Sequence, residues 1–580
     1  MSATAEPWAD DVGVLVEAVP DGAVLAVGGF HFTRIPVTQL RELGRRGTHG
    51  LRYVAWGGGL ALELLLAAGA VDRATLTFSS LDLFGPAPRF RRAVERAELE
   101  LDEWTALAMI KGLEAAGEQL AYEVFQTPAG SLFTDRFKAA PEPTEGTPLS
   151  LAPALAPDVV LLHAQRADDA GNVELTGARG LDLACIFAAR TVLVSVEERV
   201  ASGTLGGRGA FVLPRTFVSG VALAPGGAYP TSCLPYYVAD YGRLQQLAAI
   251  PAEQPFEDSL FDPSDAAEVR GIAAQPAERL RRGLLSAGST IDEDAPWTVD
   301  ELMAVWIARQ LDDASVCSIG SASPLPTAGY MLAKRLWAPN LTLLSFNGGL
   351  VDVAARPLSL LAAEALDYAS ASTHAGGDET YHWYYQRGLV THEIVSSAQI
   401  DRRGATNNIR VTRADGSHVR LPGQGGMADV ANLHANFVLY LARHSPRGLV
   451  ETVELVSARR AYFDDATRRR FGLQPGVVRL ITDLGVFEQS VGGEQLVLTH
   501  LHPGVTLAQV RERTGFELVL AAELEETDTP TREEVVVLRR EIDPLGIRRL
   551  DFIPAAERGE LIRSLLAAER AAVIPVGART

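Results

Sequence analysis

A glycine-rich turn after a buried strand is the segment of this sequence with the most chemical content. Residues 341–344 read Leu-Thr-Leu-Leu and predict a buried strand, and residues 345–349 read Ser-Phe-Asn-Gly-Gly. Strand ends of this kind lie at the mouth of an α/β sheet, where ligands usually bind. Asn347 can donate a hydrogen bond to a carbonyl or hold a water, or it can simply shape the turn. Phe346 is either a core side chain or a substrate contact.

Two other glycine-rich turns could present backbone N–H groups to a developing oxyanion. Such donors reach a reacting atom only where no Cβ intervenes. The alternative is that packing alone requires these tight turns. We predict that these residues bind the oxyanion or the rest of the ligand that bears it: Gly28, Gly29 and Phe30 in the first turn, and Gln424, Gly425 and Gly426 in the second.

Two charged residues near predicted element ends are further candidates. Glu103 lies beside Trp104, just before a helical pattern over residues 105–116, so its carboxyl could have a raised pKa and act as a general base. Its alternative role is an acidic residue favoured by the helix dipole. Arg34 follows the first glycine turn and either pairs with a substrate carboxylate or phosphate, or is an ordinary surface arginine.

The bulk composition restricts the class of protein. A chain of 580 residues is too long for a single core, and its net charge of −19 argues against nucleic acid and anionic membranes as partners. The 3 cysteines lack CxxC spacing and predict a reducing compartment. We expect no bound metal, no signal peptide and no membrane span, and therefore a cytoplasmic protein.

The order of predicted elements repeats along the chain. A helical segment, a short apolar strand closed by glycine and a second helix occur near residues 14–44 and again near 298–336. Further β-branched runs alternate with helices, which favours mostly parallel α/β sheets. We predict two similar open α/β domains, residues 1–272 and 297–580, joined by a linker at 273–296.

The ordered set of these motifs resembles the glutaconate-type class I CoA-transferases, with both subunits fused in one chain. In that family the turn at 345–349 supplies a catalytic glutamate, which here is replaced by Phe346 or Asn347, depending on the register. By this analogy we expect both residues to face the substrate at the catalytic position. The sequence also resembles the steroid ring-opening CoA hydrolases, which lack that glutamate and whose acidic turn corresponds to Glu103. The segments that carry the resemblance are 28–34, 163–173, 223–233, 333–339, 398–404, 425–429 and 514–516.

The resemblance implies an enzyme acting on an acyl-CoA thioester, with coenzyme A as part of the substrate and no permanently bound cofactor. Without the nucleophilic glutamate we expect a hydrolase or a carbon–carbon bond-cleaving enzyme. The alternatives are a glutaconyl-type CoA decarboxylase, a CoA-transferase that uses another carboxylate such as Asp352 or Glu364, and a non-catalytic acyl-CoA binder. The family further implies a possible homo-oligomer.

Overall fold

The computed structural model describes residues 7–141, 146, 148–287, 292, 294–320, 322–345, 349–490 and 492–574. Its first half is built on one large, mostly parallel sheet with the strand order β11-β9-β8-β1-β2-β3-β4, to which β10 and β12 are added beside β8. Only the β8–β9 and β9–β11 pairs are antiparallel among the described strands of this sheet. The strands are β1 (Val24–Val27), β2 (Leu51–Val54), β3 (Val71–Leu76), β4 (Glu100–Glu103), β8 (Val159–Asp168), β9 (Val173–Leu175), β10 (Thr191–Val200), β11 (Phe211–Leu213) and β12 (Gly220–Leu223).

The runs of apolar residues in its strands explain why this sheet is buried in the core of the first half. The apolar residues of β1 and the first half of β8 are almost all buried, as expected for parallel strands covered by helices on both faces. Thr105 caps α5 by accepting a hydrogen bond from the N–H of Ala108 at 3.3 Å. The helices of this half are α1 (Val12–Leu15), α2 (Val37–Arg45), α3 (Gly59–Ala67), α4 (Pro88–Glu95), α5 (Ala106–Gly117), α6 (Asp182–Ala188), α7 (Tyr241–Ala248), α8 (Ala267–Ala273) and α9 (Ala277–Ala287).

The second half contains two sheets in series. β13 pairs with β14 in parallel, and β17, β22 and β24 form a second parallel set. An isolated parallel bridge between Cys317 and His392 places β13 beside the start of β17. The strands are β13 (Val316–Ser318), β14 (Thr342–Ser345), β15 (Leu350–Val351), β16 (Thr373–His374), β17 (Ile394–Ser396), β22 (Phe437–Leu441), β24 (Val478–Thr482), β25 (Gly485–Gln489), β26 (Leu496–Leu501) and β27 (Val519–Glu526).

Antiparallel strands and helices complete the second half. β15 and β16 extend one sheet, and β25 and β26 extend the other before β27 returns to a parallel pairing. The capping box of Thr298 and Glu301 begins the first helix, as the acidic start of this segment predicts. The helices are α10 (Val299–Ala308), α11 (Pro324–Leu336), α12 (Ala363–Ser370), α13 (Gly377–Thr380), the π-helical turn Tyr381–Tyr385, α14 (Met427–Leu433), α15 (Asp465–Arg470), α16 (Leu507–Arg513), α17 (Arg532–Val537) and α18 (Ala555–Val573).

Both halves also contain smaller sheets that are separate from the main ones. They are formed by β5 (Tyr122–Gln126), β6 (Lys138–Ala139) and β7 (Leu149–Pro153); by β18 (Gln399–Asp401), β19 (Thr406–Asn407) and β23 (Leu449–Val450); and by β20 (Arg410–Thr412) and β21 (His418–Arg420).

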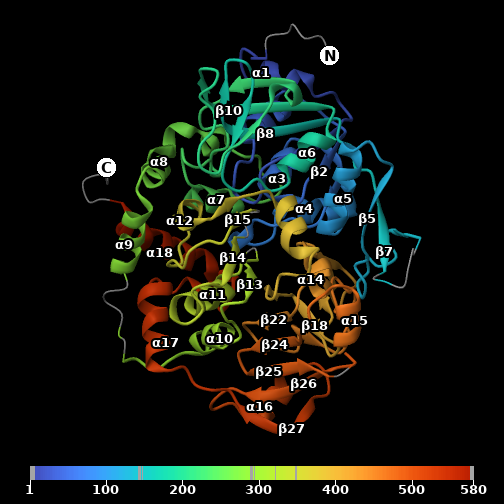
Figure 1. Cartoon of the computed structure of the whole chain (residues 1–580), viewed down its shortest axis with the longest axis vertical. Helices are drawn as coiled ribbons and strands as arrows, with labels where there is room; N and C mark the ends of the chain where they lie inside the picture. Colours follow the sequence, from blue (N-terminus) through green and yellow to red (C-terminus); the bar gives the residue numbers. More distant parts are fainter. Residues whose placement is uncertain are drawn as a thin grey trace.

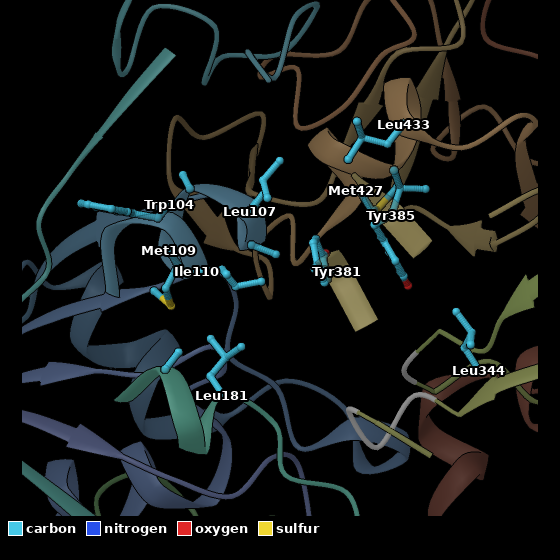
Figure 2. Close-up of a cluster of buried hydrophobic side chains, with 14 of the residues drawn as sticks. Trp104, Leu107, Met109, Ile110, Leu181, Leu344, Tyr381, Tyr385, Met427 and Leu433 are labelled. Carbon is cyan, nitrogen blue, oxygen red and sulfur yellow. The ribbon is translucent and has the colours of Figure 1, made fainter. Parts of the chain in front are cut away.

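The two halves share apolar cores. Figure 2 shows Leu107 of the first half between Trp104 and the second-half residues Tyr381 and Met427, and all four belong to one buried cluster. The segment predicted as a linker contains the helix α9, which packs against α18 at the C-terminal end of the chain (Figure 1). Residues 277–287 are therefore not a free connector: α9 and α18 tie the end of the second half back to the first.

The strands predicted within residues 14–44, within 298–336 and at 341–344 are present as β1, β13 and β14, and strands alternate with helices in both halves, which confirms the two-part α/β architecture. The three cysteines are buried and free. No helix of the described chain is both long enough and apolar enough to span a bilayer.

Candidate functional site

A cavity of about 640 Å³ lies where loops of the two halves meet. From the first half it is lined by Phe30, Trp56 and Phe78, and from the second by the ends of β13 and β14 and the loop 422–427. The aromatic rings form a connected wall, because Phe30 stacks on Trp56 with centroids 4.5 Å apart and Trp56 meets Tyr381 edge-on at 5.8 Å. The site thus combines an apolar wall with strand ends, as small-molecule sites usually do.

The first glycine turn reaches the cavity only through Phe30. The N–H of Gly28 donates to Leu161 O, that of Gly29 to Asp182 Oδ1, and that of Phe30 to Thr33 O. Gly29 has a φ of +76°, and a Cβ there would lie 2.5 Å from Thr33 O. The prediction of oxyanion donors at Gly28, Gly29 and Phe30 is therefore corrected: all three N–H groups are already engaged, with β8, with α6 and within the turn, and packing requires the glycines.

The second glycine loop lies against the cavity wall and keeps two N–H groups unused. Gly425 donates to Thr77 O, which ties the loop to the first half. The Gln424 side chain bridges the halves as well, donating to Trp104 O at 3.0 Å and accepting from Ala428 N. Among the described residues no hydrogen bond engages the N–H groups of Gln424 and Gly426, so these are the donors of the predicted set that remain available.

Gly426 offers a direct test of this wall. A Cβ at Gly426 would lie 2.5 Å from the hydroxyl oxygen of Tyr381, which is buried and lines the cavity. We expect Gly426→Ala to displace that ring, lower the free energy of unfolding by about 1–3 kcal/mol and reduce turnover. Thermal unfolding and activity are measured beside Gly271→Ala, whose added methyl group meets nothing within 4 Å. Equal activity of the two variants would contradict this placement of Tyr381.

A carboxyl group not singled out from the sequence faces this cavity. Glu393 precedes β17, and its Oε2 accepts from the Tyr385 hydroxyl at 3.0 Å; that hydroxyl also lies 2.6 Å from Ser318 Oγ. Burial raises the pKa of Glu393 to about 7, while the hydrogen bonds from Tyr385 and Ser318 oppose the shift. His434 Nδ1 lies 3.8 Å away, but burial lowers the pKa of this histidine well below its usual value, so it carries no charge that would hold Glu393 ionised.

Glu103 lies immediately behind the glycine loop. Arg420 holds its carboxylate with two hydrogen bonds of 2.8 and 2.5 Å, and a Cβ at Gly423 would approach Glu103 Oε1 to 3.0 Å. Glu103 is not among the residues that line the cavity. The bidentate pair ties β4 to β21 across the two halves, so the carboxylate is engaged structurally next to the site.

Arg34 is buried away from the cavity. Its guanidinium donates to Asp182 Oδ2 at 2.6 Å, to Ala178 O at 2.7 Å and to His163 O at 3.2 Å. It is neither a surface residue nor a free ligand, and we withdraw it as a substrate contact. His163 is likewise in the core, where its ring nitrogens form hydrogen bonds with Ser195 Oγ and Glu197 Oε1.

Comparison with known families decides what scaffold carries this site. The family model described as Coenzyme A transferase matches residues 10–221 and 301–513, more than half of the chain. The chain belongs to the coenzyme A transferase family. Subunits B and A of the 3-oxoadipate CoA-transferase of Pseudomonas knackmussii are 31% and 32% identical to it, over 42% and 38% of this chain and 92% and 80% of their own lengths.

Two other similarities bear on this CoA-transferase family member. The cholesterol ring-cleaving hydrolase IpdA subunit of Rhodococcus jostii is 32% identical over 36% of this chain and 75% of its own length. The crystal structure of the acyl-CoA transferase YdiF apoenzyme from Escherichia coli O157:H7 has a TM-score of 0.64 at 16% identity, covering 90% of this chain and 95% of that one. The second likeness shows that 90% of this chain shares the fold of that single transferase chain.

The turn that supplies the nucleophile in the resembling transferases is only partly described here. Phe346, Asn347 and Gly348 lie outside the described residues. On one side Leu344 and Ser345 end β14 and line the cavity, which confirms the predicted position of this strand end. On the other side a Cβ at Gly349 would lie 1.9 Å from Ala375 O, so only glycine fits there.

The sequence does not single out Glu393 because its exposure to the cavity depends on the fold: Tyr385 lies eight residues away, but Ser318 and His434 come from distant segments. A signal was present: a glutamate interrupts an apolar, β-branched run, where an acidic side chain must find a partner or take a proton. Two residues of the aromatic π-helical turn, Tyr381 and Tyr385, also line the cavity. The candidates Asp352 and Glu364 do not line it: Asp352 pairs with Lys334, and Glu364 accepts from Thr33 Oγ1 at 3.0 Å.

Proposed function

We propose that this CoA-transferase family member hydrolyses an acyl-CoA thioester, or cleaves a carbon–carbon bond of a β-keto acyl-CoA by adding water, without carrying CoA covalently. The observation that carries the proposal is a site whose family turn lacks a glutamate in the sequence, while a half-buried carboxyl group, Glu393, lines the cavity from the residue before β17. The similarity to a ring-cleaving hydrolase subunit supports the same reaction class.

In this proposal Glu393 is the general base. Its carboxylate takes a proton from water, whose oxygen attacks the keto carbon and forms a tetrahedral alkoxide. Collapse of the alkoxide breaks the carbon–carbon bond, gives a carboxylic acid, and leaves the bonding electrons on an enolate of the shortened acyl-CoA. The protonated Glu393 returns its proton to the enolate carbon, and the N–H groups of Gln424 and Gly426 stabilise the developing oxyanion. Simple thioester hydrolysis uses the same groups with the thiolate as leaving group.

A CoA-transferase that uses Glu393 as the nucleophile is the second candidate. It is favoured by the same observation, since Glu393 is a cavity-lining carboxyl group in a family whose curated relatives include transferases. The position of Glu393 argues against this route, because it precedes β17 rather than following β14 and is hydrogen-bonded by a tyrosine.

Product analysis separates these reactions. The full chain is incubated with acetyl-CoA, glutaconyl-CoA and a β-keto acyl-CoA in H₂¹⁸O, with and without acetate as acceptor, and the products are identified by mass spectrometry. We expect acceptor-independent release of an ¹⁸O-labelled acid. Acceptor-dependent exchange together with an enzyme–CoA adduct trapped by borohydride would overturn the proposal in favour of a transferase. Release of carbon dioxide from glutaconyl-CoA would select decarboxylation.

A further inference from the structure

The C-terminal helix α18 brings one arginine to the cavity from outside the family-matched ranges. Those ranges end at residue 513, whereas Arg558 lies in the first turn of α18 and lines the cavity. The helix is firmly held: Glu569, fully buried, accepts hydrogen bonds from Leu360 N at 2.6 Å and Leu361 N at 2.8 Å. Gln245 of the first half donates to Gly559 O at 2.7 Å, so the start of α18 is fixed against both halves.

The guanidinium of Arg558 is not neutralised by any described residue. Its Nε is buried without a hydrogen-bond partner, and no ion pair within 4.0 Å involves it in the described part of the chain. Asp551 is an acidic residue that interacts electrostatically with Arg558. Its carboxyl group already accepts hydrogen bonds from Leu325 N at 3.0 Å and from the Tyr440 hydroxyl at 3.3 Å. Burial raises the pKa of Asp551 to about 7, so this group is half neutral near pH 7 and balances the arginine poorly.

Arg558 is also the one lysine or arginine among the described residues that line the cavity. The other ionisable groups there include Asp82, Glu393 and His31, and burial lowers the pKa of His31 to about 3, so that it is neutral. In a chain of net charge −19, a local cation favours the entry of an anionic ligand because it offsets the repulsion from the surrounding negative charge. A planar guanidinium matches the paired oxygens of a carboxylate or a phosphate.

We propose that Arg558 binds an anionic oxygen group of the CoA thioester in this cavity. The inference rests on the proposed function, because acyl-CoA is the substrate class that supplies such groups. They have two sources with the same chemistry: a free carboxylate at the far end of the acyl chain, or a phosphate of coenzyme A.

The test measures binding, so it does not depend on turnover. Dissociation constants of CoA, dephospho-CoA, acetyl-CoA and succinyl-CoA are determined by calorimetry for the full-length wild type, Arg558→Gln and Arg558→Lys. Loss of a charge-assisted bidentate contact weakens binding by about 10- to 100-fold, and the lysine variant, which keeps the charge but not the fork, should lie between. Arg563→Gln is the matched control, since Arg563 is exposed on the same helix and does not line the cavity.

The pattern across ligands identifies the anion. Weakening of succinyl-CoA alone assigns the acyl carboxylate, and weakening of all but dephospho-CoA assigns the 3′-phosphate. Equal weakening of all four assigns the diphosphate. If Arg558→Gln binds every ligand as the wild type does, or if Arg563→Gln loses as much affinity, the inference is wrong while the proposed function stands. If the wild type binds none of the four, the proposed function fails first.

Discussion

Glu393→Gln is expected to lower the rate of acyl-CoA hydrolysis about 10²- to 10⁴-fold, the usual contribution of a general base. The substitution preserves the shape of the side chain. It also keeps an oxygen that can accept a hydrogen bond from the Tyr385 hydroxyl, which in the wild type lies 3.0 Å from Glu393 Oε2. What it removes is the proton-accepting carboxylate. The thiol released, or the acid formed, is followed under saturating substrate, and circular dichroism verifies that the variant is folded.

The pH dependence gives this prediction a second readout. Because the pKa of Glu393 is about 7, the fraction present as carboxylate rises from pH 6 to pH 8, and kcat/KM should rise with it. The residual activity of Glu393→Gln should lack this limb. If the general base were a carboxyl group with an ordinary pKa, kcat/KM would instead be constant above pH 6.

Two other acidic positions serve as comparisons. Asp352→Asn removes a half-exposed partner of Lys334 outside the cavity and should leave the rate within about twofold, because exposed ion pairs contribute little. Glu103→Gln should lower stability by breaking the bidentate pair with Arg420 between the halves. If Glu103→Gln abolishes hydrolysis in a folded protein while Glu393→Gln does not, the base is Glu103 and our assignment is wrong.

The fold could be predicted because its determinants are local. Short β-branched runs alternate with helical patterns, and the resulting elements match the predicted ones in both halves. The position of the strand ending at Ser345 and the importance of the loop 423–426 follow from the same local signals. The role of Gly28 and Gly29 could not be predicted, since which acceptor a backbone N–H finds depends on distant residues such as Asp182.

The rest of the site depends on contacts that no local pattern contains. Glu393 acquires its raised pKa from burial under Tyr385 and the end of β13, which are brought together only by the tertiary fold. Arg34 looks like a free cation beside a glycine turn, but Asp182, 148 positions along the chain, engages it. Arg558 reaches the cavity because α18 folds back onto α9, and a polar C-terminal segment gives no sign of this return.

Thermal stability is expected to fall as the pH rises from about 6.5 to 8. Several carboxyl groups are buried so deeply that their pKa values rise to about 7, well above the values of 3.8 and 4.5 of free Asp and Glu. They are Glu364, Glu393, Asp429, Asp551 and Glu569. Above about pH 6.5, where unfolded histidines are mostly neutral, the folded chain therefore binds more protons than the unfolded chain, and its stability decreases as the pH rises to 8. Below about pH 6.5 this slope is opposed by buried histidines whose pKa values burial lowers, so that they bind protons only on unfolding: His31, His392, His434, His444 and His502.

The acid side of the profile has the opposite cause. Arginine partners hold the pKa of Glu301 and Glu534 below the usual value against the effect of burial, so their contribution is present above about pH 4.5 and is lost as the pH falls below it. The melting temperature is measured from pH 4 to 8.5 by scanning calorimetry. A melting temperature that is constant or rises between about pH 6.5 and 8 would contradict the assigned burial of the raised carboxyl groups.

Glu393→Gln links this stability profile to the site. At pH 5 the wild-type carboxyl group is protonated and resembles the amide, so the two proteins should melt at similar temperatures. At pH 8 the wild type must keep an ionised carboxylate in a desolvated position, at a cost of up to about 3 kcal/mol for a shift of this size, and the amide has no such cost. The inactive variant should therefore become the more stable protein as the pH rises, because the same desolvation that raises the pKa of the proposed base also destabilises the fold that holds it.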